Sequence, residues 1–293
     1  MSRRSLSSPP TSVAGGASYV LLGAFLVQYA ATLAVPTFGS IGPSASSAWR
    51  FLIGAVVLIA LSRPRLRHWT RSQWASAAFL GVASALMNQS FYQAINRIHL
   101  GTAVAIEYLG PFLVAAVGKR SWRHAVFVLV AALGVLALAR PGGGLNAAGV
   151  LFACGAGCGW AAYTIASHRL GGATEGFEGL AIAMAIAALC TLPFVATSLP
   201  TVVHAPSLFV RLAIMAVLAV VLGFGAEMQA LRRLKPSVVG VLLALDPAVA
   251  FVVGLVFLKQ RVHALDLVGM ALVVLAGVGV MRDAHDASGA TSL

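Results

Sequence analysis

The sequence predicts an all-α polytopic membrane protein with ten transmembrane helices, arranged as two inverted repeats of five helices. Of the 293 residues, 59% are hydrophobic and only 10% are charged, whereas soluble domains carry roughly 25% charged residues. Apolar runs of about 20 residues, the length that spans a bilayer as a helix, recur along the whole chain. A segment of the first half also reappears, in altered form, in the second half.

The apolar runs mark the expected transmembrane helices, and Pro, Gly and charged residues separate them. Arg3 and Arg4 precede the first run and raise a signal-peptide alternative. That run is long for a signal peptide and further runs follow it, so we take it as the first span. The expected spans are residues 18–35, 44–61, 74–96, 100–118, 124–139, 147–167, 177–198, 208–231, 236–258 and 265–281.

These spans divide the chain into two five-helix domains, residues 18–140 and 147–281. The sequence P-G-G-G-L-N at residues 141–146 is expected to link them, because Pro and Gly interrupt helices. The polar segments 1–17 and 282–293 flank the two domains. Both are expected in the cytoplasm, and the first is expected to be disordered.

The internal repeat is clearest around two prolines, one in each half. Gln93 and Pro111 have counterparts 136 residues later, at Gln229 and Pro247. Two similar units that each cross the membrane an odd number of times must do so in opposite senses. The count of five spans per unit therefore predicts an inverted repeat, as in many secondary transporters.

Three acids lie inside apolar spans, namely Glu107, Glu227 and Asp246. A charged group inside the membrane is costly and indicates a functional site by default. Desolvation disfavours the charged form of a buried carboxylate, so such a group can carry a proton, or it can bind a substrate ammonium. The sequence does not separate these two uses. The alternative is a structural acid paired with Arg50 or a polar side chain. For Glu227 the alternative is an interfacial ion pair with the basic edge at Arg232, Arg233 and Lys235.

Helix breaks are expected beside two of these acids, at Gly110, Pro111 and Pro247. A proline removes one backbone hydrogen bond and frees a carbonyl group. Glu107 and Asp246 are therefore expected to face one central cavity near the bilayer middle, each from a helix broken near its proline.

Polar and aromatic side chains accompany the acids within the spans. Trp160 and Tyr163 are mid-span and share one helix face at i, i+3, which favours a cavity lining over an interfacial anchor. Gln28 by itself is more typical of a hydrogen bond between helices. The remaining candidates for the cavity are Asn88, Tyr92 and Tyr108.

Other function classes find little support. The net charge of +12 comes from basic residues between the apolar runs, which indicates membrane topology and lipid contact, with no nucleic-acid partner. The three cysteines lie in apolar runs without a metal-binding pattern, so neither a metal nor a cofactor is expected. An intramembrane enzyme would need a nucleophile–base pair, an aspartate dyad in a protease context or a metal set such as H-E-x-x-H, and the sequence shows none of these patterns. Gly155 and Gly159 form a small-xxx-small pair, which indicates close packing within the bundle or in a homodimer.

Four sequence blocks resemble a known family. They are M-N-Q-S-F-Y-Q-A-I-N-R-I-H-L-G-T-A-V-A-I-E-Y-L-G-P from Met87, G-A-G-C-G-W-A-A-Y from Gly155, E-M-Q-A-L from Glu227 and L-A-L-D-P-A-V-A from Leu243. With them the chain resembles the EamA-type carriers of the drug/metabolite transporter superfamily, and within it the bacterial threonine/homoserine exporter branch. The general outline covers nearly the whole chain, and the first block is the most specific.

The resemblance implies ten helices in two inverted repeats around a central cavity. It implies efflux of small amino acids or similar metabolites through the bacterial inner membrane, in exchange for protons and with no enzyme activity. It places the cavity residues of the family at Glu107, Trp160, Tyr163, Glu227 and Asp246.

The chain departs from the family pattern at three places. His99 stands where a proline is usual, Asp246 where a glutamate is usual, and Lys259-Gln260 where Gly-Glu is usual. Asp is one methylene shorter than Glu, which changes the cavity and with it the expected substrate. A broader metabolite or drug exporter of the same fold therefore stays open as an alternative.

The distribution of basic residues predicts that both termini are cytoplasmic. With the N-terminus inside, 14 Lys and Arg residues fall on the inner side and five on the outer side, in line with the positive-inside rule. A reporter enzyme that works only in the periplasm, fused after Leu293, is expected to be inactive. Activity of that fusion would rule out the ten-span topology.

Overall fold

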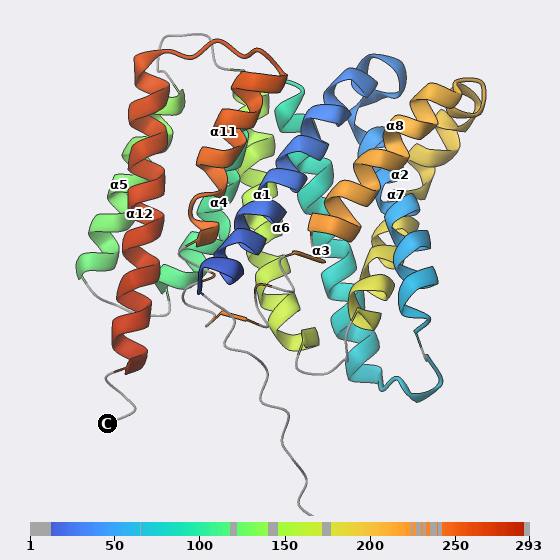
Figure 1. Ribbon diagram of the computed structural model, residues 1–293, viewed down its shortest axis with the longest axis horizontal. Coiled ribbons are helices and arrows are strands. Elements are labelled where there is room, and N and C mark those ends of the chain that lie inside the picture. The colour runs from blue at the N-terminus through green and yellow to red at the C-terminus, as the bar shows by residue number, and fades with distance from the viewer. Residues whose placement is uncertain are drawn as a thin grey trace, which may run out of the picture.

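The computed structural model is a bundle of long helices that run up and down in alternation (Figure 1). It describes residues 13–64, 66–117, 122–139, 146–171, 177–223 and 242–289, together with residues 225, 226, 230, 233, 234 and 239. Within these ranges the chain is helical or turns between helices, without strands, so the predicted all-α class is confirmed. The α-helices are α1 (Val13–Ala34), α2 (Phe38–Ser62), α3 (Arg71–Ile95), α4 (Leu100–Val117), α5 (Trp122–Ala139), α6 (Ala147–Gly171), α7 (Glu178–Val203), α8 (Pro206–Ala216), α11 (Asp246–Phe257) and α12 (Ala264–Gly289).

Several of these helices have the length and composition of membrane spans. Four stretches qualify on both counts, and shorter apolar helices accompany them. The first stretch, Gly15–Ser62, is 48 residues long and would measure about 72 Å as one straight helix, more than twice the hydrocarbon core. It instead turns at the short 3₁₀ helix η1 (Val35–Thr37) and at Gly42, where φ is +79° ahead of Pro43. It therefore supplies two helices, α1 and α2.

The eighth and ninth expected spans differ most from the structure. Helix α8 is only 11 residues long and continues as the π-helix η3 (Val217–Gly223), while α11 begins only at Asp246. Most of the chain between η3 and α11, including the candidate Glu227, lies outside the described residues. The 141–146 linker lies outside them as well, apart from Asn146.

Helix α3 is less apolar than the other long helices, and one of its faces packs inside the bundle. It packs against α6 and α7 along its length, and it carries Asn88, Gln89 and Gln93 in its second half. Gln89 and Gln93 donate hydrogen bonds to the carbonyl and the hydroxyl of Ser44 on α2, at 3.1 and 2.9 Å. Protein neighbours thus satisfy polar groups that lipid cannot.

The outer faces of the bundle are apolar, as a membrane-embedded surface requires. Large side chains such as Leu151, Leu189 and Leu275 are more than 60% exposed, far beyond the scattered apolar residues of a soluble monomer. In Figure 1, α5 and α12 form one end of the bundle and α2, α7 and α8 form the other. Helices α1, α3, α4, α6 and α11 lie between these ends, and they supply most of the residues that line the site described below.

The Gly155/Gly159 pair packs within one chain. A Cβ atom added to Gly159 would lie 2.7 Å from the Cα of Met87, and one added to Gly155 would lie 3.3 Å from the hydroxyl of Ser90. Both neighbours belong to α3. Of the two roles expected for this pair, the structure therefore shows the packing of α6 on α3.

A second close contact joins the last helix of each half of the chain, where α5 packs on α12. A Cβ atom on Gly134 would lie 2.8 Å from the carbonyl oxygen of Gly269, and one on Gly269 would lie 2.6 Å from that of Gly134. Real Cβ atoms essentially never come so near a backbone oxygen. Only glycine at both positions allows the two backbones to meet in this way.

This contact predicts that Gly134→Val destabilises the bundle without touching the central site. Overpacking of a close contact costs about 1–3 kcal/mol, so the purified variant in detergent is expected to unfold at a lower temperature than the wild type. Gly39→Ala is the matched control, because an added Cβ there meets nothing within 4 Å. Equal unfolding temperatures for wild type and Gly134→Val would refute the proposed packing of α5 on α12.

Candidate functional site

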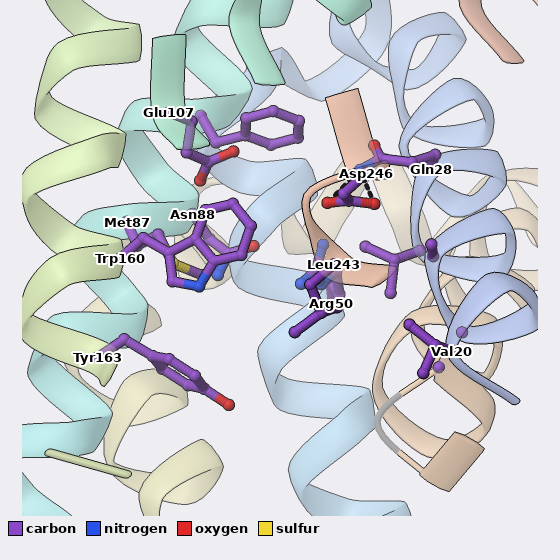
Figure 2. A pocket seen from close by; sticks show the side chains of 15 residues that line it. Val20, Gln28, Arg50, Met87, Asn88, Glu107, Trp160, Tyr163, Leu243 and Asp246 are labelled. Atoms are coloured by element: carbon purple, nitrogen blue, oxygen red, sulfur yellow. Dashed lines mark hydrogen bonds between the residues drawn. The ribbon is translucent and has the colours of Figure 1, made fainter. Parts of the chain in front are cut away.

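A cavity of about 120 Å³ lies among the middle helices of the bundle (Figure 2). This is the volume open to the centre of a water-sized sphere, and one bound water needs roughly 10–15 Å³ of it. The cavity therefore has room for several waters or one small solute. Side chains from both halves of the chain line it, and three of them are ionisable. The lining residues are Val20, Gly23, Ala24, Val27, Gln28, Arg50, Met87, Asn88, Phe91, Glu107, Trp160, Tyr163, Gly223, Leu243 and Asp246.

Asp246 enters the cavity from the start of α11. It is the first residue of the helix, with Pro247 following it, a position that suits proline because the first helical N–H groups have no partner within the helix. The Nε2 of Gln28 on α1 donates to both carboxylate oxygens of Asp246, at 3.2 Å each. The positive end of the helix dipole also lies at this carboxylate. Asp246 is thus held by two elements that are distant in the sequence.

Glu107 reaches the same cavity from α4 on the opposite wall (Figure 2). Its side chain is buried, with 7% exposure. No hydrogen bond or ion pair joins it to another described side chain, in contrast to Asp246. Its oxygens are therefore available to a proton or to a donor group on a solute.

The structure corrects the expected helix break beside Glu107. Helix α4 runs through Gly110 and Pro111 without interruption. Pro111 cannot donate to the carbonyl of Glu107 four residues earlier, but Gly157 of α6 lies against that carbonyl, where an added Cβ would be 3.0 Å from the oxygen. Gly110 packs on the backbone of Gly157 so closely that any side chain would clash. The backbone of α6 thus covers the weak point and keeps α4 helical.

An arginine is the third charged group of the cavity. Arg50 extends from α2, is 4% exposed, and lies between the Glu107 and Asp246 walls in Figure 2. Its Nη1 donates to the hydroxyl of Tyr92 over 3.4 Å, and its guanidinium group lies 5.8 Å from the ring centre of Tyr92. The sequence pointed to Arg50 only as a partner for an acid, although the cost of a charge within an apolar span marks it as a cavity residue in its own right.

Two aromatic rings of α6 form part of the wall. Trp160 and Tyr163 line the cavity as expected from their spacing. Behind Trp160 lies Tyr108, edge to face at a centroid distance of 5.9 Å. Tyr108 is 2% exposed and lines no part of the cavity, so it positions Trp160 rather than contacting a solute.

The other expected site residues divide between the cavity wall and the layer behind it. Gln28 and Asn88 line the cavity, and Asn88 donates to the carbonyl of Ser84 on its own helix at 3.1 Å. Tyr92 lies behind the wall, where its hydroxyl contacts Arg50 and the sulfur of Met215. Within the described part of the chain, no three His, Cys, Asp or Glu side chains gather as a metal site.

This arrangement suits the binding of a small polar solute inside a membrane. It combines an arginine and two acids with aromatic faces in a space among apolar helices. It holds none of the nucleophile–base pairs on which covalent catalysis depends, as far as the described side chains extend. The geometry thus matches a carrier site better than a catalytic one.

Comparison with known proteins agrees with this interpretation. A solved crystal structure matches the fold with a TM-score of 0.60 over 92% of this chain and 98% of the other, at 18% identity. The threonine/homoserine exporter RhtA of Escherichia coli (strain K12) is 32% identical over 256 residues, 86% of each chain. RhtA of Salmonella typhimurium (strain SL1344) is 31% identical over 264 residues, 89% of each chain.

The family profile accounts for almost the whole sequence. The profile of the EamA-like transporter family matches twice, at residues 14–139 and at residues 147–282. The two copies and the similarity to the RhtA exporters establish a multi-pass membrane transporter and not an enzyme. The chain belongs to the EamA-like transporter family.

Proposed function

We propose that the protein exports small amino acids such as threonine and homoserine across the bacterial inner membrane in exchange for protons. The observation that carries this proposal is the pair of buried carboxylates, Glu107 and Asp246, that face one cavity from the two halves of the chain. Ionisable groups at such depth are typical of proton relays and substrate sites in transporters. The substrate itself is carried over from the similar RhtA exporters.

The size of the cavity favours a small substrate. Its volume of about 120 Å³ is below the roughly 300–1,000 Å³ of pockets that take drug-sized molecules. An amino acid with a short side chain is the better match. The broader drug exporter, which we keep as the second candidate, would need a cavity that expands during transport.

The two carboxylates offer two kinds of acceptor. Asp246 already accepts from the amide of Gln28, and a substrate ammonium would replace or join this donor. Glu107 has no donor among the described residues, so it is open to a proton or to the same ammonium. If a proton and the substrate compete for these carboxylate oxygens, the protein exchanges protons for the amino acid.

We further propose ten spans in two inverted repeats, residues 18–140 and 147–281, with both termini in the cytoplasm. The packing of the helices supports a two-fold relation between the halves. If α1 to α5 correspond to α6, α7, α8, α11 and α12, then the contact of α4 with α6 corresponds to that of α11 with α1. The contact of α3 with α7 likewise corresponds to that of α8 with α2. Such a relation suits alternating access around a central site.

A homodimer stays a prediction that the present structure leaves untested. The small-residue pair Gly155 and Gly159, which raised it, is covered by α3 within the same chain. A dimer interface would therefore have to use another face of the bundle.

The site assignment predicts that Glu107→Gln and Asp246→Asn each lower amino-acid efflux. The amides keep the size and the hydrogen-bonding capacity of the acids but cannot ionise. Loss of a hydrogen bond to a charged group corresponds to roughly tenfold or more in binding, so efflux of threonine from preloaded cells is expected to fall about tenfold. The dependence of efflux on an imposed pH gradient is expected to weaken as well.

Glu178→Gln provides the matched control, since Glu178 lies in the first turn of α7 away from the cavity. This variant should export threonine like the wild type, and all variants should reach the membrane in equal amounts. Normal efflux with unchanged pH dependence in the Glu107→Gln/Asp246→Asn double variant would remove both residues from the mechanism.

A further inference from the structure

Arg50 is a buried cation without an ion-pair partner among the residues that the structure describes. No carboxylate oxygen of a described residue lies within 4 Å of its guanidinium group, although Glu107 and Asp246 line the same cavity. Its Nε has no hydrogen-bond partner at all among the described residues. The long contact from Nη1 to Tyr92 is the one side-chain hydrogen bond that the described structure gives it.

The surroundings of Arg50 compensate its burial only in part. The rings of Tyr92 and Phe51 lie 5.8 and 6.0 Å from the guanidinium carbon, which allows weak cation–π contacts. Such contacts offset only part of the cost of removing a charge from water. Arginine also has five N–H donors, and buried polar groups in native proteins nearly always have partners. A purely structural role leaves this deficit unexplained.

We propose that Arg50 binds the carboxylate of the transported amino acid. Its planar fork of N–H donors fits a carboxylate in a bidentate manner, and the group lies where a solute in the cavity would meet it (Figure 2). The acids on the adjoining walls then face the ammonium end of the same molecule. This inference rests on the proposed function and extends it, because it requires a free carboxylate in the substrate.

The inference narrows the substrate class. A zwitterion places one anion against Arg50 and one cation against Glu107 or Asp246, so both kinds of buried charge gain a partner at once. An amine or an amide of an amino acid satisfies the acids but leaves Arg50 unpaired. A site discriminates strongly against an analogue when binding of that analogue leaves a buried polar group of the protein without a partner.

The test compares the binding of L-threonine and L-threonine amide to the purified full-length protein in detergent. The wild type is expected to bind L-threonine more tightly than the amide. Arg50→Gln is expected to lower the affinity for L-threonine by about 10- to 100-fold, the range of a hydrogen bond to a charged group. The affinity for the amide should change little, because the amide makes no ion pair with Arg50.

Two further variants control for folding and for charge. Arg97→Gln removes the same charge from an exposed arginine that bonds to Gln93 and stacks on Phe152 outside the cavity, and it should bind both ligands like the wild type. Arg50→Lys keeps the positive charge but loses the planar fork. If Arg50→Gln fails to fold, Arg50→Lys still tests the idea, with weaker binding of L-threonine and unchanged binding of the amide.

The possible results separate the two proposals. Binding of L-threonine to a folded Arg50 variant as tight as to the wild type contradicts the role of Arg50 and leaves the export function standing. Equal losses for L-threonine and its amide also contradict it, since they indicate general damage to the cavity. A wild-type protein that binds neither L-threonine nor L-homoserine contradicts the proposed function, and this inference with it.

Discussion

The cost of burying charge in an apolar bundle is the constraint on which the site depends. Arg50, Glu107 and Asp246 are each at least 90% buried, yet none of them forms an ion pair with another in the described structure. Permanent pairing would satisfy the charges and close the site to a solute. The protein instead holds them on separate walls of one cavity, with Gln28 on Asp246 and Tyr92 beside Arg50 as partial compensation. A carrier needs binding groups that its own side chains pair only in part, because the solute has to supply the missing partners.

Backbone packing between the halves keeps these walls in place. The glycines of α6 let its backbone touch α4 at the carbonyl that Pro111 leaves without a partner, and this contact supports Glu107 from behind. No backbone contact of this kind is needed at Asp246, because Asp246 and Pro247 lie in the first turn of α11. The N–H groups of a first turn have no acceptor within the helix, so a proline there costs no hydrogen bond. The same pair of residue types, an acid near a proline, is thus accommodated by a continuous helix in one half and by a helix start in the other.

The sequence predicts most of the helices and places Glu107 and Asp246 in one cavity, because both predictions rest on strong physical signals. Apolar length predicts the helices, and mid-span carboxylates stand out by their cost. Tyr108 does not line the cavity because consecutive helical residues lie about 100° apart, so the residue next to Glu107 faces the α5 and α12 side. Tyr92 lies one helical turn after Asn88, behind the cavity wall, where its hydroxyl accepts a hydrogen bond from Arg50. The helix at Pro111 depends on a backbone contact from α6, and no local sequence pattern contains that information.

Coupled flux in vesicles tests the central claim most directly. Purified protein is reconstituted into proteoliposomes loaded with labelled L-threonine, and threonine exit and internal pH are followed together. If the buried acids exchange a proton for the amino acid, threonine exit acidifies the lumen, and an outside-acidic gradient drives threonine out even against its own concentration gradient. Threonine exit at the same rate with and without a pH gradient, and with no change of internal pH, would contradict proton exchange through this cavity.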